Sequence, residues 1–242
     1  MTILFVSDLH LSPERPEVTR AFLGFLQSEA SGAKALFVLG DLFEAWIGDD
    51  DSCPTGISVQ KALKKLTDKG VALFIQHGNR DFFLGKRFMK AAGATLLGDE
   101  HLVEYNDQTV LVMHGDTLCT DDIDYIRFRR KIRHPLSKFC LQLLPLNYRQ
   151  RLANNMRAKS KVANANKPSS IMDVNADAVE MVMSKHQVTT LIHGHTHRPD
   201  RHQQENGERI VLGDWHNKGW YLVWDSNGYH LIDFDIRAPS NQ

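Results

Sequence analysis

Five apolar segments of this chain each run into a short turn that carries histidine, aspartate or asparagine side chains. The stretches between the first three segments include helical apolar spacing, as at Val18, Phe22 and Phe25, so the pattern favours an α/β fold. In such folds the carboxyl ends of the strands meet at one edge of a sheet, where ligands bind. We therefore expect the five turns to converge. The apolar segments are residues 3–7, 35–39, 71–76, 109–113 and 189–192.

The last of these turns lies within the sequence T-T-L-I-H-G-H-T-H-R-P, residues 189–199. Residues two apart in extended backbone point to the same side, so His195 and His197 can face a common centre. His193 can join them only if Gly194 bends the chain. A single histidine is more often an ordinary surface or core residue, but three within five positions indicate a metal-binding turn.

The composition is typical of a soluble globular protein, with 42% apolar and 24% charged residues. The three cysteines, Cys53, Cys119 and Cys140, are odd in number and lack C-x-x-C spacing, which favours a reducing compartment. No basic residues precede the N-terminal apolar run, and Asp8 interrupts that run, so we expect no secretory signal. No stretch approaches the roughly 18 apolar residues of a transmembrane helix. These features predict a cytoplasmic protein.

The formal net charge is zero, but the charges are unevenly distributed. Residues 125–172 hold 12 of the 29 Lys and Arg and none of the 29 Asp and Glu. Three expected helices in this region, 121–132, 136–144 and 148–161, combine basic and apolar residues, which is typical of a cap facing an anionic, apolar partner. We predict a helical, basic lid at residues 121–171, inserted into a core of residues 1–120 and 172–242.

Two other interpretations of the insertion are open. One is a helical subdomain with its own small core and a solvated basic face. The other is nucleic-acid binding, because Lys and Arg bind phosphate backbones nonspecifically. The aromatic residues Phe128, Phe139 and Tyr148 are too few for a base-stacking platform, so we expect no nucleic-acid partner.

After the insertion, we expect Asp173 to cap a helix that begins at Val174. Residues 209–212, 221–224 and 229–234 are expected to close the fold as antiparallel strands, the last pair turning at Ser226-Asn227-Gly228.

The polar side chains at the five strand ends form a candidate metal site. They offer nitrogen and oxygen donors and no thiolate, a set that allows Mn, Fe, Zn or Ni without choosing among them. Seven donors are too many for one transition metal and suit two metals that share a carboxylate. The seven are Asp8, His10, Asp41, Asn79, His114, His195 and His197.

The order D-x-H, G-D, G-N, H-G and G-H-x-H over residues 8–197 resembles the calcineurin-like metallophosphoesterase superfamily. The resemblance implies a sandwich of two mixed β-sheets flanked by helices, here with a helical cap insertion. It also implies hydrolysis at phosphorus, since two metals acidify a bridging water and clamp the phosphoryl oxygens. The implied ligands are Asp8, His10, Asp41 and His197 for the first metal, and Asp41, Asn79, His114 and His195 for the second, with Asp41 bridging. His193, His77 and Asp116 would support these ligands.

The chain departs from the superfamily at Gly78-Asn79-Arg80-Asp81, where the family usually has G-N-H-E or G-N-H-D. A guanidinium cannot act as a general acid near neutral pH, so the leaving group should need no proton. Arg80 therefore favours a pyrophosphate bond over an alkyl phosphoester, unless it only positions other groups. Glu44 stands where the superfamily often has Asp, which leaves a supporting role for Glu44 open.

Longer motifs resemble one branch of the superfamily, the UDP-2,3-diacylglucosamine diphosphatases of lipid A biosynthesis. The motifs lie at Gly40–Asp51, His77–Arg87, His114–Asp122 and Ile192–Pro199. This resemblance implies two Mn²⁺ per chain and a peripheral position on the cytoplasmic face of the inner membrane, with no obligate protein partner. The implied reaction is attack on the α-phosphorus of UDP-2,3-diacylglucosamine, giving UMP and 2,3-diacylglucosamine 1-phosphate (lipid X).

The same resemblance implies a set of functional residues. Arg80, His195 and Asp41 would be catalytic. The substrate contacts would be Asn79, Arg80, Asp122, Ser160, Asn164, Lys167 and His195. Two alternatives stay open: a generic nucleotide phosphodiesterase or nuclease of the same fold, which Arg80 and the apolar, basic insertion disfavour, and a non-catalytic binding scaffold, which the seven competent ligands disfavour.

Overall fold

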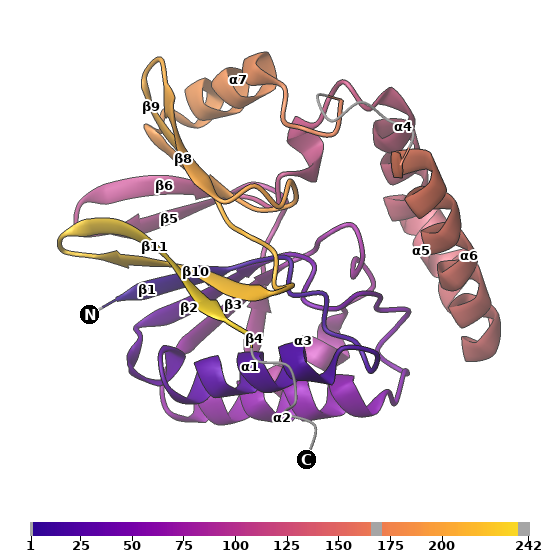
Figure 1. The fold of residues 1–242 in the computed structure, drawn as a ribbon. Helices are drawn as coiled ribbons and strands as arrows, with labels where there is room; N and C mark the ends of the chain where they lie inside the picture. The colour runs from indigo at the N-terminus through magenta and orange to yellow at the C-terminus, as the bar shows by residue number, and fades with distance from the viewer. Residues whose placement is uncertain (1, 166–170, 237–242) are drawn as a thin grey trace.

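The computed structural model describes residues 2–165 and 171–236, except for the side chains of residues 161 and 163–165. Two β-sheets stack in the middle of the fold, and helices cover their outer faces (Figure 1). Three further helices stand to one side of the stack as a cap (Figure 1). This arrangement confirms the predicted sandwich of two mixed sheets.

The first sheet has the strand order β11-β10-β1-β2-β3-β4. Strands β1 to β4 are parallel, and the β10–β11 hairpin joins them antiparallel to β1. The turn between β10 and β11 is the predicted one. The strands are β1 (Ile3–Val6), β2 (Ala35–Leu39), β3 (Ala72–Gln76), β4 (Ala94–Leu96), β10 (Lys218–Asp225) and β11 (Gly228–Asp235).

The second sheet has the order β5-β6-β7-β9-β8. Its central strands β6, β7 and β9 are parallel, and an antiparallel neighbour closes each edge. The strands are β5 (His101–Tyr105), β6 (Gln108–Val112), β7 (Thr190–His193), β8 (Asp200–Gln204) and β9 (Gly207–Val211).

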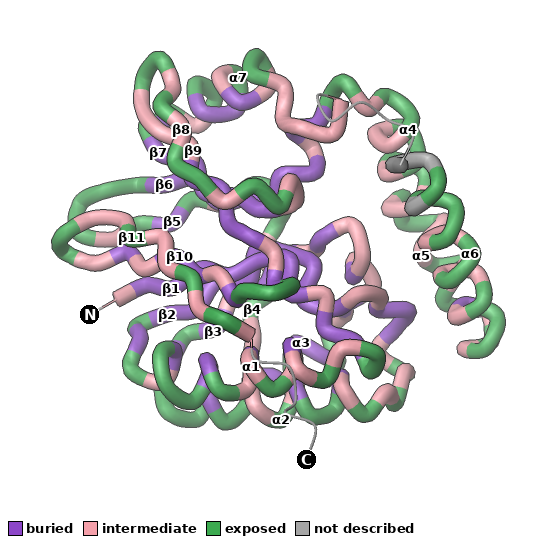
Figure 2. Tube along the Cα trace, viewed as in Figure 1, coloured by how far each residue is buried: buried purple, intermediate pink, exposed green. Residues whose placement is uncertain are grey.

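Apolar residues between the layers hold the core together. Between the sheets, Phe5 stacks on Phe37 at 5.1 Å, and Phe37 on Phe74 at 4.6 Å. A second cluster joins the first sheet to helices α1 to α3, and a third joins the second sheet to α7. Buried backbone accordingly runs through the centre of the stack (Figure 2). The helices are α1 (Pro16–Gln27), α2 (Pro54–Asp68), α3 (Lys86–Ala92) and α7 (Ala176–His186), with short 3-10 turns η1 (Ala30–Gly32) and η2 (Asp116–Leu118).

The cap consists of α4 (Ile123–Arg133), α5 (Pro135–Gln142) and α6 (Leu146–Ala165). Within the described part of these helices, Arg149 is the one buried residue. Large apolar side chains such as Leu136, Phe139 and Leu143 are 64%, 58% and 69% exposed. The structure therefore does not support a subdomain with its own apolar core. No described helix is long and apolar enough to cross a membrane.

Three details of the sequence analysis were wrong or incomplete. Strand β9 is antiparallel to β8 but parallel to β7, and β8 itself was not predicted because its sequence D-R-H-Q-Q has no apolar alternation. The short edge strand β4 was also missed. Helix α7 begins at Ala176, and the side chain of Asn175, not that of Asp173, accepts a hydrogen bond from Ala178 N at 3.1 Å.

Candidate metal centre

The five predicted turns converge at the edge where both sheets present the carboxyl ends of their parallel strands. Strands β1, β2 and β3 contribute from the first sheet, and β6 and β7 from the second. The backbone at this edge is unusual, because five candidate ligands have left-handed φ angles between 49° and 67°. Such a conformation costs about 1–3 kcal/mol at a non-glycine residue. The five are Asp8, His10, Asp41, His195 and His197.

Glycines beside the ligands are required for close approach. A Cβ on Gly194 would lie 2.2 Å from Asp8 Oδ2, and one on Gly78 would lie 2.0 Å from Asp41 Oδ1. Neither glycine has positive φ. Gly194 therefore makes room for the Asp8 carboxylate, whereas the sequence pattern had suggested a bend.

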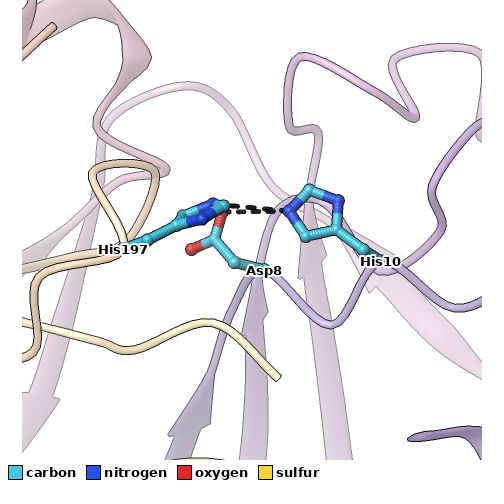
Figure 3. A group of neighbouring side chains, drawn as sticks. All are labelled: Asp8, His10 and His197. Carbon is cyan, nitrogen blue, oxygen red and sulfur yellow. Dashed lines mark hydrogen bonds and ion pairs between the residues drawn. The ribbon is translucent and has the colours of Figure 1, made fainter. Parts of the chain in front are cut away.

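Asp8, His10 and His197 form the first group, with both imidazoles turned toward the carboxylate (Figure 3). Asp8 Oδ1 lies 3.3 Å from His197 Nε2 and 4.0 Å from His10 Nε2. The two Nε2 atoms are 3.4 Å apart. Asp8 Oδ1 is buried and has no hydrogen bond of good geometry to the described residues. A cation between these three atoms would satisfy all of them.

The second group contains Asp8, Asp41 and His114, whose ligand atoms lie within 4.8 Å of one another. Asn79 Oδ1 joins it, 3.1 Å from both His114 Nε2 and His195 Nδ1. Asp41 Oδ2 lies between the groups, 3.9 Å from His10 Nε2 and 3.8 Å from His114 Nε2. All seven predicted ligands are thus brought together, although both groups contain Asp8 and the bridging role of Asp41 stays a prediction.

Polar groups on the far side of the imidazoles orient the nitrogens that face the centre. His114 Nδ1 lies 2.8 Å from the carbonyl of Leu39 and must carry a proton that it donates to that carbonyl. The lone pair of Nε2 can then bind a metal at the centre. His10 Nδ1 lies 3.3 Å from Glu44 Oε2, and His197 Nδ1 lies 3.6 Å from Asp214 Oδ2. Carboxylates in this position commonly orient metal-bound histidines.

The electrostatic field of the centre favours a cation. Burial alone would lower the pKa of His10, but its contact with the Glu44 carboxylate and the charges of Asp41 and Asp8 raise it to about 9. Burial would raise the pKa of Asp8, yet His197 and the other histidines hold it well below its usual range. The charges that attract a proton here would also attract a metal ion. The oxygen and nitrogen donors and the unsatisfied Asp8 Oδ1 therefore fit a pair of divalent metals.

His193 is fully buried, and the contacts of its ring nitrogens are with groups outside the ligand set. Arg209 Nη1 can only donate, at 3.2 Å, so His193 Nε2 accepts and Nδ1 donates to Gly194 O at 2.8 Å. Burial, helped by Arg209, lowers the pKa of His193 to about 3. Both ring nitrogens are engaged, so His193 is unsuited to bind a metal.

The other two residues expected to support the ligands bind elsewhere. His77 Nε2 contacts the carbonyl of Leu84 at 2.7 Å. Asp116 accepts from Tyr125 Oη at 2.5 Å and from Arg129 Nε at 2.7 Å, both on cap helix α4. Their orienting roles toward the ligands stay predictions.

A cavity of about 650 Å³ opens between the metal centre and the cap. Its core wall includes Asn79, Arg80 and His195, and Asp122 and Ser160 line it from the cap side. Asn164 belongs to α6 but its side chain is not described, and Lys167 lies outside the described residues. The apolar wall is formed by Phe82, Phe83, Phe128, Ile132, Leu141, Leu152 and Met156.

Two supporting carboxylates, Asp81 and Asp214, were not predicted from the sequence. Asp81 accepts from Gly78 N and from Leu42 N, both at 2.8 Å, and so ties two ligand turns together. Burial and the nearby Asp41 charge raise its pKa to about 7. Its place beside Arg80 in the quoted motif was an available signal. Asp214 lies in the loop after β9, with no local signal to connect it to His197.

Comparison with known proteins shows which chains this one is similar to. The calcineurin-like phosphoesterase family matches residues 1–199. A UDP-2,3-diacylglucosamine hydrolase from Enterobacter sp. (strain 638) is 53% identical over 97% of this chain and 99% of its own length. A hydrolase of the same name from Pseudomonas fluorescens (strain Pf-5) is 52% identical over 97% and 95%. The solved structure of Yfce, a phosphoesterase from E. coli, covers 98% of this chain and 100% of its own, with 18% identity and a TM-score of 0.49. The chain therefore belongs to the calcineurin-like phosphoesterase family, within it to the group of relatives named UDP-2,3-diacylglucosamine hydrolase.

Proposed function

We propose that this protein hydrolyses the pyrophosphate bond of UDP-2,3-diacylglucosamine, releasing UMP and 2,3-diacylglucosamine 1-phosphate. The observation that carries the proposal is the cavity, which joins a two-metal donor set to an apolar wall. A substrate that carries both a phosphoanhydride and acyl chains needs a metal site and an apolar surface within one pocket. The names of relatives with about half of their residues identical support the same substrate.

One metal would be held by Asp8, His10, Asp41 and His197. The other metal would be held by Asp41, Asn79, His114 and His195. When bound, a pair of divalent metals supplies an acidified water and neutralises phosphate charge. We assign Mn²⁺, which accepts this mixture of carboxylate, amide and imidazole donors. His195→Ala and His197→Ala should each weaken one metal, whereas His193→Ala should retain both.

Arg80 lines the cavity beside these ligands, with its backbone N–H donating to Asp41 Oδ1 at 2.8 Å. Its Nη1 lies 3.6 Å from Glu44 Oε1, and both residues line the cavity. The guanidinium would bind phosphate oxygens and stabilise the charge on the departing group. That group is a phosphomonoester with a second pKa of about 6, so it leaves as an anion without a general acid. His195 would contact the attacked phosphate.

Asp122, Ser160, Asn164 and Lys167 would contact the remainder of the substrate from the cap. The apolar wall of the cavity would hold the acyl chains. The exposed leucines and phenylalanine of α5, together with the basic outer residues of α4, would place the cap against an anionic membrane surface. We therefore propose a peripheral position on the cytoplasmic face of the inner membrane, with residues 121–171 acting as the lid.

One assay separates this function from its alternatives. Purified protein with Mn²⁺ is supplied with UDP-diacylglucosamine, UDP-glucose, bis-p-nitrophenyl phosphate and single-stranded DNA in ¹⁸O-labelled water. We expect the lipid nucleotide to be hydrolysed fastest, with the solvent oxygen on UMP. Faster cleavage of DNA or of the simple diester would favour a generic phosphodiesterase, and no hydrolysis of any substrate would favour a binding scaffold.

A further inference from the structure

Cap helices α4 and α5 each donate a hydrogen bond to the loop that carries Asn79 and Arg80. Arg133 Nη2 donates to the carbonyl of Gly78 at 2.7 Å. Lys138 Nζ donates to the carbonyl of Phe82 at 2.7 Å. The Arg133 guanidinium also lies 5.8 Å from the ring centroid of Phe82. Part of the cap's positive charge is therefore directed inward, onto the core.

Two core carboxylates hold Arg133 in place. Its Nη1 contacts Asp99 Oδ1 at 3.1 Å, and its Nη2 lies 3.5 Å from Asp116 Oδ2. Arg129, one helical turn earlier, binds the same two carboxylates at 2.8 Å and 2.7 Å. The Arg133 side chain is only 14% exposed. A guanidinium with several fixed partners keeps one orientation, so it can fix the peptide it binds.

The peptide that Arg133 binds leads directly into a candidate ligand. Gly78 O belongs to the peptide plane joining Gly78 to Asn79, whose Oδ1 lies 3.1 Å from two imidazoles. The core holds the loop by its amides, with Asp81 accepting from Gly78 N and Asp41 from Arg80 N. The cap holds it by two carbonyls. Rotation of the Gly78–Asn79 plane would move Asn79 away from the centre and shift Arg80 with it.

We propose that Arg133 is a positioning residue for Asn79 and Arg80, acting through the Gly78 carbonyl. The cap then completes the geometry of the metal and phosphate site in addition to covering the acyl chains. This inference rests on the proposed function for the roles of Asn79 and Arg80. The competing explanation is that Arg133 only fastens the cap to the core.

The test compares Arg133→Gln with Arg130→Gln, a control at an exposed position of the same helix. Mn²⁺ affinity is measured by titration calorimetry without substrate, and kcat and KM are measured for the lipid nucleotide and for bis-p-nitrophenyl phosphate. We expect Arg133→Gln to weaken Mn²⁺ binding about 10-fold, as loss of an orienting partner does. It should lower kcat for both substrates, because the diester uses the centre without filling the acyl wall.

The proposal would be overturned if Arg133→Gln raised only the KM for the lipid. In that case its Mn²⁺ affinity and its diester turnover would equal those of Arg130→Gln. Asp99→Asn is a second variant, at a residue that is 52% exposed, and it loosens Arg133 without removing it. It should shift Mn²⁺ affinity and kcat in the same direction by a smaller factor, and unchanged values would also overturn the proposal. Failure of the wild-type protein to cleave the lipid would refute the proposed function alone, because metal affinity and diester turnover still decide the role of Arg133.

Discussion

The ligand turns of the core and the helices of the cap face the same cavity, but they are built differently. In the core, Asp8 and Asp41 are 0% and 2% exposed and are surrounded by directed polar contacts on strained backbone. In the cap, Leu136 and Leu143 are more than half exposed, and the described apolar residues that line the cavity from its helices are not buried. Fixed polar geometry suits metals and phosphate, whereas an open apolar surface suits acyl chains, whose contacts are non-directional.

The difference also shows in how the two regions are joined. Charged side chains of the cap contact backbone carbonyls and carboxylates of the core, as at Arg133 and at Arg149, which donates to Ile47 O at 2.6 Å and pairs with Asp50. Polar contacts of this kind specify orientation through their geometry. The cap is therefore held in a fixed orientation toward the site, although no apolar residue in the described part of its helices is buried.

The largest effect is expected from removing a central charge of the core. Asp41→Asn keeps an oxygen for Arg80 N but loses a negative charge between the two groups. We expect turnover to fall by about 10³-fold and bound Mn²⁺ to decrease. Elemental analysis of the dialysed protein and steady-state kinetics measure the two effects. Wild-type metal content together with wild-type turnover would contradict the central role of Asp41.

Arg80→His should lower turnover by about 10²-fold with metal content preserved, because Arg80 contributes charge at the cavity and is not a predicted ligand. Metal analysis is run beside the kinetics, with Arg87→His as a control on a nearby basic residue. Loss of metal in Arg80→His would show that Arg80 is structural instead.

A cap variant should affect lipid binding rather than chemistry. Arg149→Met removes the contacts that hold α6 to the carbonyl of Ile47 and the carboxylate of Asp50. We expect KM for the lipid nucleotide to rise about 10-fold while turnover of bis-p-nitrophenyl phosphate changes little. Arg151→Met, at an exposed position of the same helix, is the matched control. An equal fall in turnover of both substrates would mean that α6, like α4, shapes the metal centre.

Substitutions of exposed leucines in the cap are expected to have the smallest effect, with almost no change in the free energy of unfolding. Leu136→Ser with Leu143→Ser should change the free energy of unfolding by no more than about 0.5 kcal/mol per site, because both side chains are exposed. Binding to vesicles containing anionic lipid, measured by sedimentation, should fall several-fold. Met181→Ser alters a 71% exposed apolar residue of α7 on the core and should leave vesicle binding unchanged. An equal loss of vesicle binding in the Leu136/Leu143 variant and in Met181→Ser would contradict the proposal that the cap contacts the membrane.

Much of the core and its site could be predicted from local sequence. The segments that became β1, β2, β3, β6 and β7 each contain consecutive apolar residues, and each is followed within a few residues by its candidate ligand. The edge strands β4 and β8 were harder to detect, since β4 has three residues and β8 is entirely polar. Asp214 could not be connected to His197, because nothing local marks a carboxylate whose partner comes from another loop.

The sequence by itself determined which residues could bind metal and the order in which strands deliver them, because strand length, apolar runs and ligand chemistry are local properties. Only the tertiary structure decided that two facing sheets share the site, that His193 turns to Arg209, and that Gly194 makes room for Asp8. It also decided which basic residues of the cap face inward. These outcomes depend on contacts between segments far apart in the chain, and such contacts are set by packing and burial, which no single window of sequence contains.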